Sequence, residues 1–248
     1  MLPGILTTLA ALAPPPLADP ATKVPLKRQL TLYGGTTRAT WTQTQQNNKP
    51  TTNKYTETKT AHANTYVNLL PRDEPTPSVA ELAAEIQDAW GARVQTTLFR
   101  TPLVSYLYER GWRQNFANAG FPGIDKEYEE VAAFFAPCAG DCAVVADVSC
   151  GSGLMTRRLL ASAAFGRVIA LDYSESMLAE TARRIADEGL PAERLTLCRA
   201  DVAALPLVAG SVAAVHAGAA LHCWPQLEES LAAVRAVLAP GGRFFPPP

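Results

Sequence analysis

Residues 144–154 read VVADVSCGSGL, an apolar run followed by Asp147 and a short loop that contains Gly151 and Gly153. An apolar run bounded by turn residues is typical of a buried strand. A glycine-rich turn between a strand and a helix presents backbone N–H groups and a helix N-terminus to an anionic or carbonyl-rich ligand. The stretch therefore predicts a ligand-binding strand–loop–helix unit, and it leaves open a nicotinamide cofactor, a nucleotide and a sulfonium cofactor.

Beyond this loop, strand patterns alternate with helix patterns. Further strands are expected within RVIALD (167–172), RLTLCRAD (194–201) and SVAAVHAGAAL (211–221). Helices are expected within GSGLMTRRLLASA (151–163), SESMLAETARRIADEG (174–189) and QLEESLAAVRAVL (226–238). This alternation indicates βαβ units, and hence an α/β Rossmann-like fold with a parallel sheet and helices on both faces. Ligands of such sheets bind at the carboxyl ends of the strands.

The first 72 residues have a different composition, with 15 threonines, eight Lys or Arg and only two acids. Few acids and few large apolar residues favour an unpacked arm, so we expect residues 1–75 to be a low-complexity, mostly disordered segment. The same composition is typical of an organelle transit peptide, with a plain low-complexity tail or an incorrectly predicted start as alternatives. Residues 76–140 are expected to form a helical lid and N-terminal extension, with helices at SVAELAAEIQDAW, TPLVSYLYERGW and DKEYEEVAAFF.

Charge and cysteine usage limit the partners. The other 14 basic and 21 acidic residues lie beyond residue 72, and this acidic balance argues against nucleic-acid binding, which needs a basic face. The opening MLPGILTTLAALAPPPLA is too short and too rich in proline to span a bilayer, so no transmembrane segment is expected. Cys138 and Cys142 have no second pair of metal-ligand spacing, which favours free thiols over a zinc site. We therefore expect no metal, and the oligomeric state stays open.

Acidic residues at the strand ends help to distinguish the cofactors. The nicotinamide fingerprint G-x-G-x-x-G requires a third glycine, where this chain has Thr156. A sulfonium cofactor needs a carboxylate near its amino-acid end, a glycine loop, an acid for two ribose hydroxyls and a polar group for the adenine amine. The residues that supply these in order are Asp147, Gly151 with Gly153, Asp172 and Asp201. Asp172 suits NAD equally well, so it is Asp201 that favours the sulfonium cofactor.

Five segments, VVADVSCGSG, VIALDYSESML, RADVAALPL, HAGAALHCWP and VRAVLAPGG, resemble the successive motifs of class I S-adenosylmethionine-dependent methyltransferases. They are most similar to the methyltransferase-type-11 group, which includes ubiquinone/menaquinone-biosynthesis enzymes. Together with FRTPLVSYLYERGWRQNFANAGFPG, they resemble the narrower group of uncharacterised chloroplast methyltransferases of plants and algae. The resemblance covers residues 98–242. It implies S-adenosyl-L-methionine as cofactor, methyl transfer to a small organic acceptor such as a quinone, lipid or pigment precursor, and a plastid location, with a cytoplasmic one as the alternative.

The resemblance also implies roles for single residues. It places Asp147, Ser149, Gly151 and Gly153 in the first cofactor loop, Asp172, Tyr173 and Met177 beside the ribose and adenine, Asp201 and Val202 at the adenine, and His216 along the methionine part. The broader group usually has glycine where Ser149 stands, whereas the chloroplast group shares the serine. A lid over cofactor and substrate would include Tyr108, Trp112, Arg113 and Phe116.

Two expectations concern activity. The family sheet has seven strands in the order 3-2-1-4-5-7-6, and this sequence ends at GGRFFPPP, so residues 141–248 are expected to form a C-terminally incomplete cofactor-binding domain, truncated after strand four or early in strand five. An inactive cofactor-binding fragment that acts as a partner or regulator is therefore an alternative to an enzyme, and an NAD-dependent oxidoreductase is disfavoured. His222 is the candidate catalytic base, because imidazole titrates near neutrality; a structural histidine is the equal alternative.

Overall fold

The computed structural model describes residues 17–18, 26–33, 36–43, 55–59, 65–69 and 123–247. Within these ranges the strands are β1 (Leu26–Tyr33), β2 (Thr36–Gln43), β3 (Tyr55–Lys59), β4 (Thr65–Asn68), β5 (Gly140–Val148), β6 (Phe165–Asp172), β7 (Leu195–Arg199), β8 (Val212–His216) and β9 (Leu238–Phe245). The α-helices are α5 (Ile124–Phe135), α6 (Leu154–Ser162), α7 (Glu175–Asp187) and α8 (Leu227–Val237). Short 3₁₀ turns are η3 (Ala136–Cys138), η4 (Ala192–Arg194), η5 (Val202–Ala204) and η6 (Leu221–Cys223).

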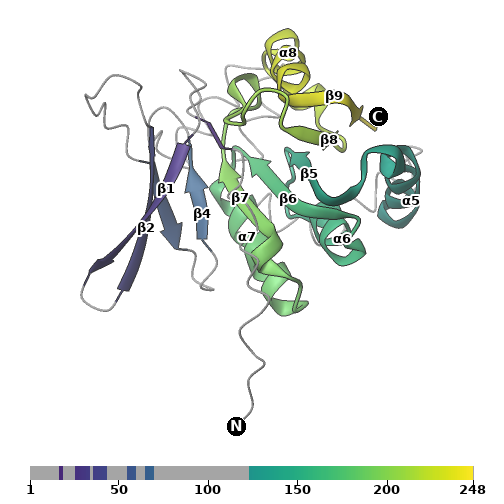
Figure 1. The fold of residues 1–248 in the computed structure, drawn as a ribbon. Helices are drawn as coiled ribbons and strands as arrows, with labels where there is room; N and C mark the ends of the chain where they lie inside the picture. Colours follow the sequence, from purple (N-terminus) through teal and green to yellow (C-terminus); the bar gives the residue numbers. More distant parts are fainter. Residues whose placement is uncertain are drawn as a thin grey trace, which may run out of the picture.

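The strands form one sheet in the order β1-β2-β3-β4-β7-β6-β5-β8-β9 (Figure 1). The six strands from β4 to β9 run parallel to their neighbours, whereas β1 to β4 pair antiparallel. Since β5 is the strand before the glycine loop, the order β7-β6-β5-β8-β9 corresponds to 3-2-1-4-5 of the expected family sheet. The prediction of an α/β, Rossmann-like parallel sheet is confirmed, and strand five is present as β9 at the edge of the described sheet.

The amino-terminal region contributes the strands β1 to β4 to the described part of the chain. β1 and β2 pair along their whole lengths, and β4 pairs parallel with β7. Leu17, Tyr66 and Leu69 are buried, and Leu17 forms an isolated bridge with Leu207. Threonine, which is abundant in these segments, is β-branched and well suited to strands. The rest of the arm, and the helices expected at SVAELAAEIQDAW and TPLVSYLYERGW, lie outside the described residues.

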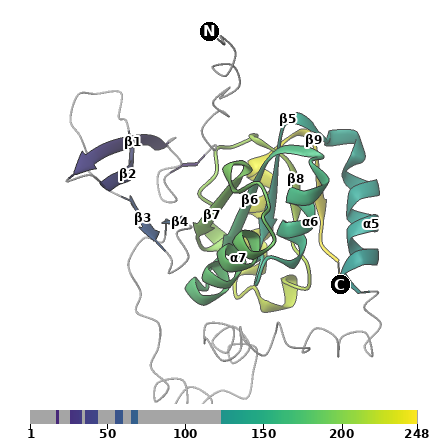
Figure 2. The same ribbon diagram turned by 90° about the horizontal axis from the view of Figure 1, so that it is seen from below.

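Helices cover both faces of the parallel sheet, as expected (Figures 1 and 2). On one face, α5, α6 and α7 bury residues such as Phe135, Leu159 and Ile185 against Val145 of β5 and its neighbours. On the other face, α8 packs against the next residue of β5, Ala146, and against β8. Successive residues of β5 thus enter opposite cores, which explains why this strand reads as a continuous apolar run.

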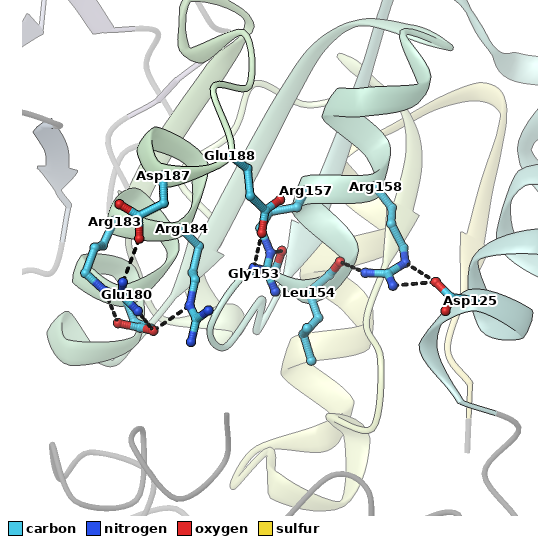
Figure 3. Close-up of polar contacts among 10 residues, drawn as sticks. All are labelled: Asp125, Gly153, Leu154, Arg157, Arg158, Glu180, Arg183, Arg184, Asp187 and Glu188. Carbon is cyan, nitrogen blue, oxygen red and sulfur yellow. Dashed lines mark hydrogen bonds and ion pairs between the residues drawn. The ribbon is translucent and has the colours of Figure 1, made fainter. Parts of the chain in front are cut away.

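Ion pairs hold α6 between its two neighbours (Figure 3). Arg157 donates to Glu188, which lies just after α7, at 2.6 Å, and its Nε donates to the carbonyl of Gly153 at 3.3 Å. On the other side, Arg158 pairs with Asp125 of α5. The side chains of Arg157 and Glu188 are 9% and 45% exposed, whereas those of Arg158 and Asp125 are 27% and 86% exposed, so solvent screens the second pair more than the first.

Candidate functional site

The segment between β5 and α6, residues 149–153, is the glycine loop. Ser149, Gly151 and Gly153 all have left-handed backbone conformations, with φ of 56°, 57° and 78°. A non-glycine residue is uncommon in this region, which explains why the broader group uses glycine where Ser149 stands. Gly153 has a second requirement, because a Cβ there would lie 2.5 Å from Cγ2 of Thr181 on α7.

Neighbouring elements fix the backbone of the glycine loop. The N–H of Gly151 donates to Oδ2 of Asp172 at 2.9 Å, and Thr181 Oγ1 donates to the Gly151 carbonyl at 2.9 Å. The N–H of Cys150 donates to the carbonyl of Leu171 at 3.0 Å. The loop is therefore anchored to β6 and α7 before any ligand binds, and such preorganisation reduces the ordering cost of binding.

Asp172 ends β6 directly beside the glycine loop. Besides the Gly151 N–H, its carboxylate accepts the N–H of Ser174 at 2.8 Å. Burial raises the pKa of Asp172 to about 6, although these two hydrogen bonds lower it. Each carboxylate oxygen can accept a second bond, so the group keeps capacity for hydroxyl donors from a ligand.

Residues that follow Asp172 line the same edge of the sheet. Tyr173 is partly exposed, and its ring lies under the guanidinium of Arg199, 5.9 Å from the ring centroid. The Nε of Arg199 also donates to the Tyr173 carbonyl at 3.1 Å. Met177 is buried in α7, where its N–H donates to the Ser174 cap.

Asp201 and Val202 follow β7, the next strand of the sheet. Asp201 accepts the N–H of Ala203 at 2.9 Å and caps the 3₁₀ turn η5, which begins at Val202. Both residues are partly exposed. Because Asp172 on β6 is in register with Arg199 on β7, Asp172 and Asp201 lie at adjacent carboxyl ends of the sheet.

Asp147 and His216 belong to a set of four polar side chains beneath the loop, the buried polar cluster of Glu127, His216, Asp147 and Thr156. His216 Nδ1 lies 2.8 Å from Asp147 Oδ1, and Nε2 lies 3.2 Å from Glu127 Oε1. Thr156 Oγ1 donates to Asp147 Oδ2 at 2.5 Å. Burial alone lowers the pKa of His216, but the hydrogen bonds to Asp147 and Glu127 outweigh it and raise that pKa above its ordinary value.

Further groups at the loop are relevant to ligand binding. Gly153 at the N-cap of α6 provides no capping side chain, and the first turn of the helix contains no acid. The hydroxyl of Ser152, 1% exposed, has no hydrogen-bond partner within the described part of the chain. On the other side of the loop, Trp224 Nε1 donates to Ser149 Oγ at 3.0 Å.

The structure thus gathers nearly all of the predicted site residues at one edge of the sheet. His222 lies in η6, but its side chain is outside the described set, as are the expected lid residues Tyr108, Trp112, Arg113 and Phe116. Sequence reasoning missed Glu127 and treated Thr156 only as a departure from a fingerprint. A signal was available for Glu127: it is an acid on the otherwise apolar face that α5 buries with Val131 and Phe135.

Metal and membrane features are absent from the described ranges. No group of three His, Cys, Asp or Glu side chains there is arranged to hold a metal ion. The cysteines between residues 123 and 247 are all free. No helix in that part of the structure combines the length and the apolar character needed to cross a bilayer.

Comparisons with known proteins find similarity to methyltransferases. Residues 145–242 match the model of a family described as a methyltransferase domain. An uncharacterised chloroplastic methyltransferase of Arabidopsis thaliana is 53% identical over 153 residues, which cover 61% of this chain and 42% of the relative. A second from the same plant is 48% identical over 153 residues and is covered to 43%. A ubiquinone/menaquinone biosynthesis C-methyltransferase of Paracoccus denitrificans is 36% identical over 99 residues, 40% of this chain and 39% of that protein.

The resemblance to methyltransferases predicted from the motifs is therefore confirmed. The match begins at Val145 within β5 and ends at Gly242 within β9, so it takes in the glycine loop, Asp172 and Asp201. The matched part of this chain spans less than half the length of each plant relative.

Proposed function

We propose that this chain, whose residues 145–242 belong to a family of methyltransferase domains, binds S-adenosyl-L-methionine and transfers its methyl group to a small organic acceptor. The observation that carries the proposal is the pair of strand-end carboxylates, Asp172 and Asp201, beside a preorganised glycine loop. One acid suits the two ribose hydroxyls, and the second suits the adenine amine. NAD carries the same adenosine, and what speaks against it is Thr156, which occupies the position of the third glycine of the NAD fingerprint.

The residues of the site fit this cofactor. The unsatisfied N–H groups at the start of α6 suit the carboxylate of the methionine part, since a helix N-terminus attracts negative charge. The Ser152 hydroxyl, buried without a partner within the described part of the chain, is the kind of group that a polar ligand satisfies. The loop residues Ser149, Gly151 and Gly153 would hold the methionine part, with Tyr173, Met177 and Val202 around the adenine.

Asp147 and His216 have a less direct role in this proposal. Both are almost fully buried, at 1% and 2% exposure, and both oxygens of Asp147 already accept hydrogen bonds. They therefore influence the loop through their charge and their hydrogen bonds. The loop residues 149–153 are the ones that would contact the cofactor.

Alignment is the main catalytic contribution that this chain would make. When bound, the cofactor supplies a methyl group on a positively charged sulfur, which departs as a neutral thioether. Holding the acceptor in line with that methyl group contributes up to roughly 7–11 kcal/mol in favourable cases. His222, just after β8, is our candidate for the group that removes a proton from the acceptor.

The acceptor and the location are proposed from the relatives. The Paracoccus enzyme is named for C-methylation in ubiquinone and menaquinone biosynthesis, and both Arabidopsis relatives are named as chloroplastic. We therefore propose a prenylated hydroquinone as the first acceptor to test, and a plastid as the location. Lipid and pigment precursors are the next acceptors.

A transfer assay tests the proposal. The full chain is incubated with S-adenosylmethionine labelled in its methyl group and with a prenylated hydroquinone, and extracted label is counted. Label in the acceptor, lost in Asp172→Asn but retained in Asp141→Asn, is the expected result, because Asp141 is an exposed aspartate far from the loop edge of β5. Cofactor binding without transfer to any acceptor would favour the inactive cofactor-binding fragment instead.

A further inference from the structure

The buried polar cluster connects four elements that surround the glycine loop. Glu127 comes from α5, His216 from β8, Asp147 from β5 and Thr156 from α6. Their exposures are 5%, 2%, 1% and 0%, and each bonds to the next. Buried charges persist only where they are paired and hydrogen-bonded, so a cluster of this kind depends on all of its members.

The geometry requires one proton to be held between Glu127 and His216. His216 Nδ1 lies 2.8 Å from Asp147 Oδ1, and an ionised carboxylate can only accept, so the ring hydrogen belongs on Nδ1 when Asp147 is charged. The other ring nitrogen faces a carboxylate oxygen of Glu127 at 3.2 Å, and without a proton two lone pairs would meet there. The contact between Nε2 and Oε1 is satisfied if His216 is an imidazolium or if Glu127 is protonated. Either state contains one proton more than a neutral His216 with both Asp147 and Glu127 ionised.

The backbone at Gly218 leaves no space for a side chain next to the cluster. A Cβ on Gly218, just after β8, would lie 2.8 Å from Glu127 Oε1 and 2.7 Å from His216 Cε1. The groups that face the His216 ring are Glu127 from α5 and Asp147 from β5, with Thr156 of α6 on the far side of Asp147. Beyond the loop stands Asp172 of β6, whose pKa is raised by burial and, to a smaller degree, by the charge of Asp147.

The cluster acts on the loop through Asp147. This residue lies two positions before the loop, and Thr156 lies in the first turn of the helix that follows the loop. The Asp147–Thr156 bond therefore spans residues 149–153, and the His216 ring sets the orientation of that carboxylate. Glu127 in turn determines whether the ring keeps its proton.

We propose that Glu127 is a positioning residue for the cofactor: by holding a proton on His216, it fixes the Asp147–Thr156 bond that sets the geometry of the glycine loop. The inference rests on the proposed function. It makes cofactor affinity depend on a side chain of α5 that is linked to the loop through His216 and Asp147. It also links helix α5, the last of the three helices expected within residues 76–140, to cofactor binding.

The pH dependence has a defined sign. Since the pKa of His216 is raised in the folded chain, by hydrogen bonds to Asp147 and Glu127 that outweigh burial, the contribution of its proton is complete below the ordinary value of 6.5. It is lost as the pH rises through the raised value. Cofactor affinity is therefore expected to fall on the alkaline side, between neutral pH and the pH at which His216 has lost its proton.

The test uses the full chain, with Glu127→Gln as the variant and Glu130→Gln as a matched control, because Glu130 is exposed on the same helix. The pKa of His216 is measured by NMR on ring-labelled histidine in the absence of ligand. The sequence contains three histidines, so a His216→Asn variant assigns the signal. The affinity for S-adenosylhomocysteine is measured by calorimetry from pH 7 to 9.5, and circular dichroism checks the fold of each variant.

In the wild type and in Glu130→Gln, the affinity for S-adenosylhomocysteine is expected to fall as the pH rises, with the same midpoint as the His216 titration. In Glu127→Gln, we expect affinity at pH 7 to be lower by about tenfold, within the usual range for coupled sites, and nearly independent of pH. Equal affinities in Glu127→Gln and wild type would overturn the inference, as would a wild-type affinity that does not change with pH over the range in which His216 titrates. Neither result would contradict the cofactor assignment.

Two controls keep the outcomes distinct. If Glu127→Gln does not fold, Gly218→Ala crowds both the Glu127 carboxylate and the His216 ring and so disturbs their contact. It is expected to lower affinity in the same way, and an unchanged affinity there overturns the inference. A wild-type chain that binds no S-adenosylhomocysteine contradicts the proposed function itself. In that case a His216 pKa at or below 6.5 in the NMR titration also removes the proton-holding role of Glu127.

Discussion

Replacing Gly153 by alanine tests whether the glycine loop is held by close contact with α7. Gly153 has φ of 78°, and a Cβ there would lie 2.5 Å from Cγ2 and 2.9 Å from Oγ1 of Thr181, a fully buried residue. The left-handed conformation costs a non-glycine residue about 1–2 kcal/mol, and overpacking adds about 1–3 kcal/mol. We therefore expect Gly153→Ala to lower the free energy of unfolding by about 2–5 kcal/mol.

Gly189→Ala is the matched control for the conformational part of this loss. Gly189 has φ of 63°, but a Cβ there would meet nothing within 4 Å, so only about 1–2 kcal/mol is expected. Urea unfolding at neutral pH, followed by circular dichroism, measures both variants. Adding Thr181→Ser to Gly153→Ala removes the nearest methyl group and should restore part of the loss. Equal losses in Gly153→Ala and Gly189→Ala, with no restoration by serine, would refute the reasoning.

Three other predictions concern single side chains. Because burial raises the pKa of Asp172 to about 6, the affinity for S-adenosylhomocysteine, measured by calorimetry, should weaken as the pH is lowered through that value. Asp172→Asn should abolish this pH dependence, and a persistent decline in the variant contradicts the role of the carboxylate. Arg157→Gln should lower the free energy of unfolding by about 1–2 kcal/mol, because a nearly buried guanidinium loses its bond to the loop and its pairing with Glu188, which solvent partly screens. Arg158→Gln, at an exposed pair, should change it by less than about 1 kcal/mol. Trp224→Phe removes the indole hydrogen bond to the loop and should cost about 1 kcal/mol in urea unfolding; no change would mean that the bond contributes nothing measurable.

Apolar runs predicted the parallel strands because a strand buried on both faces is continuously apolar. The run at 143–149 predicts a strand at the position of β5, but β5 begins at Gly140, where the residues are exposed. Gly140 pairs with Phe165 through the backbone, so the hydropathy of the sequence does not reveal this pairing. The pairing of β4 with β7 could not be predicted either, because it joins segments about 130 residues apart through backbone hydrogen bonds.

The site was predictable where a residue's role follows from its place at a strand end. Asp172 and Asp201 were identified in this way, since parallel strands end at one edge of the sheet. Glu127 was not, because an acid in the first turn of a helix is already explained by the helix dipole. Its partner His216 is 89 residues away in sequence, and only the fold brings the two side chains together.

Calorimetric titration of the full chain with S-adenosylhomocysteine and, separately, with NAD tests the central claim most directly. The account predicts micromolar binding of S-adenosylhomocysteine, no binding of NAD, and a loss of affinity in Asp172→Asn that Asp141→Asn does not share. A folded chain that binds neither ligand, or that binds NAD in preference, would contradict it.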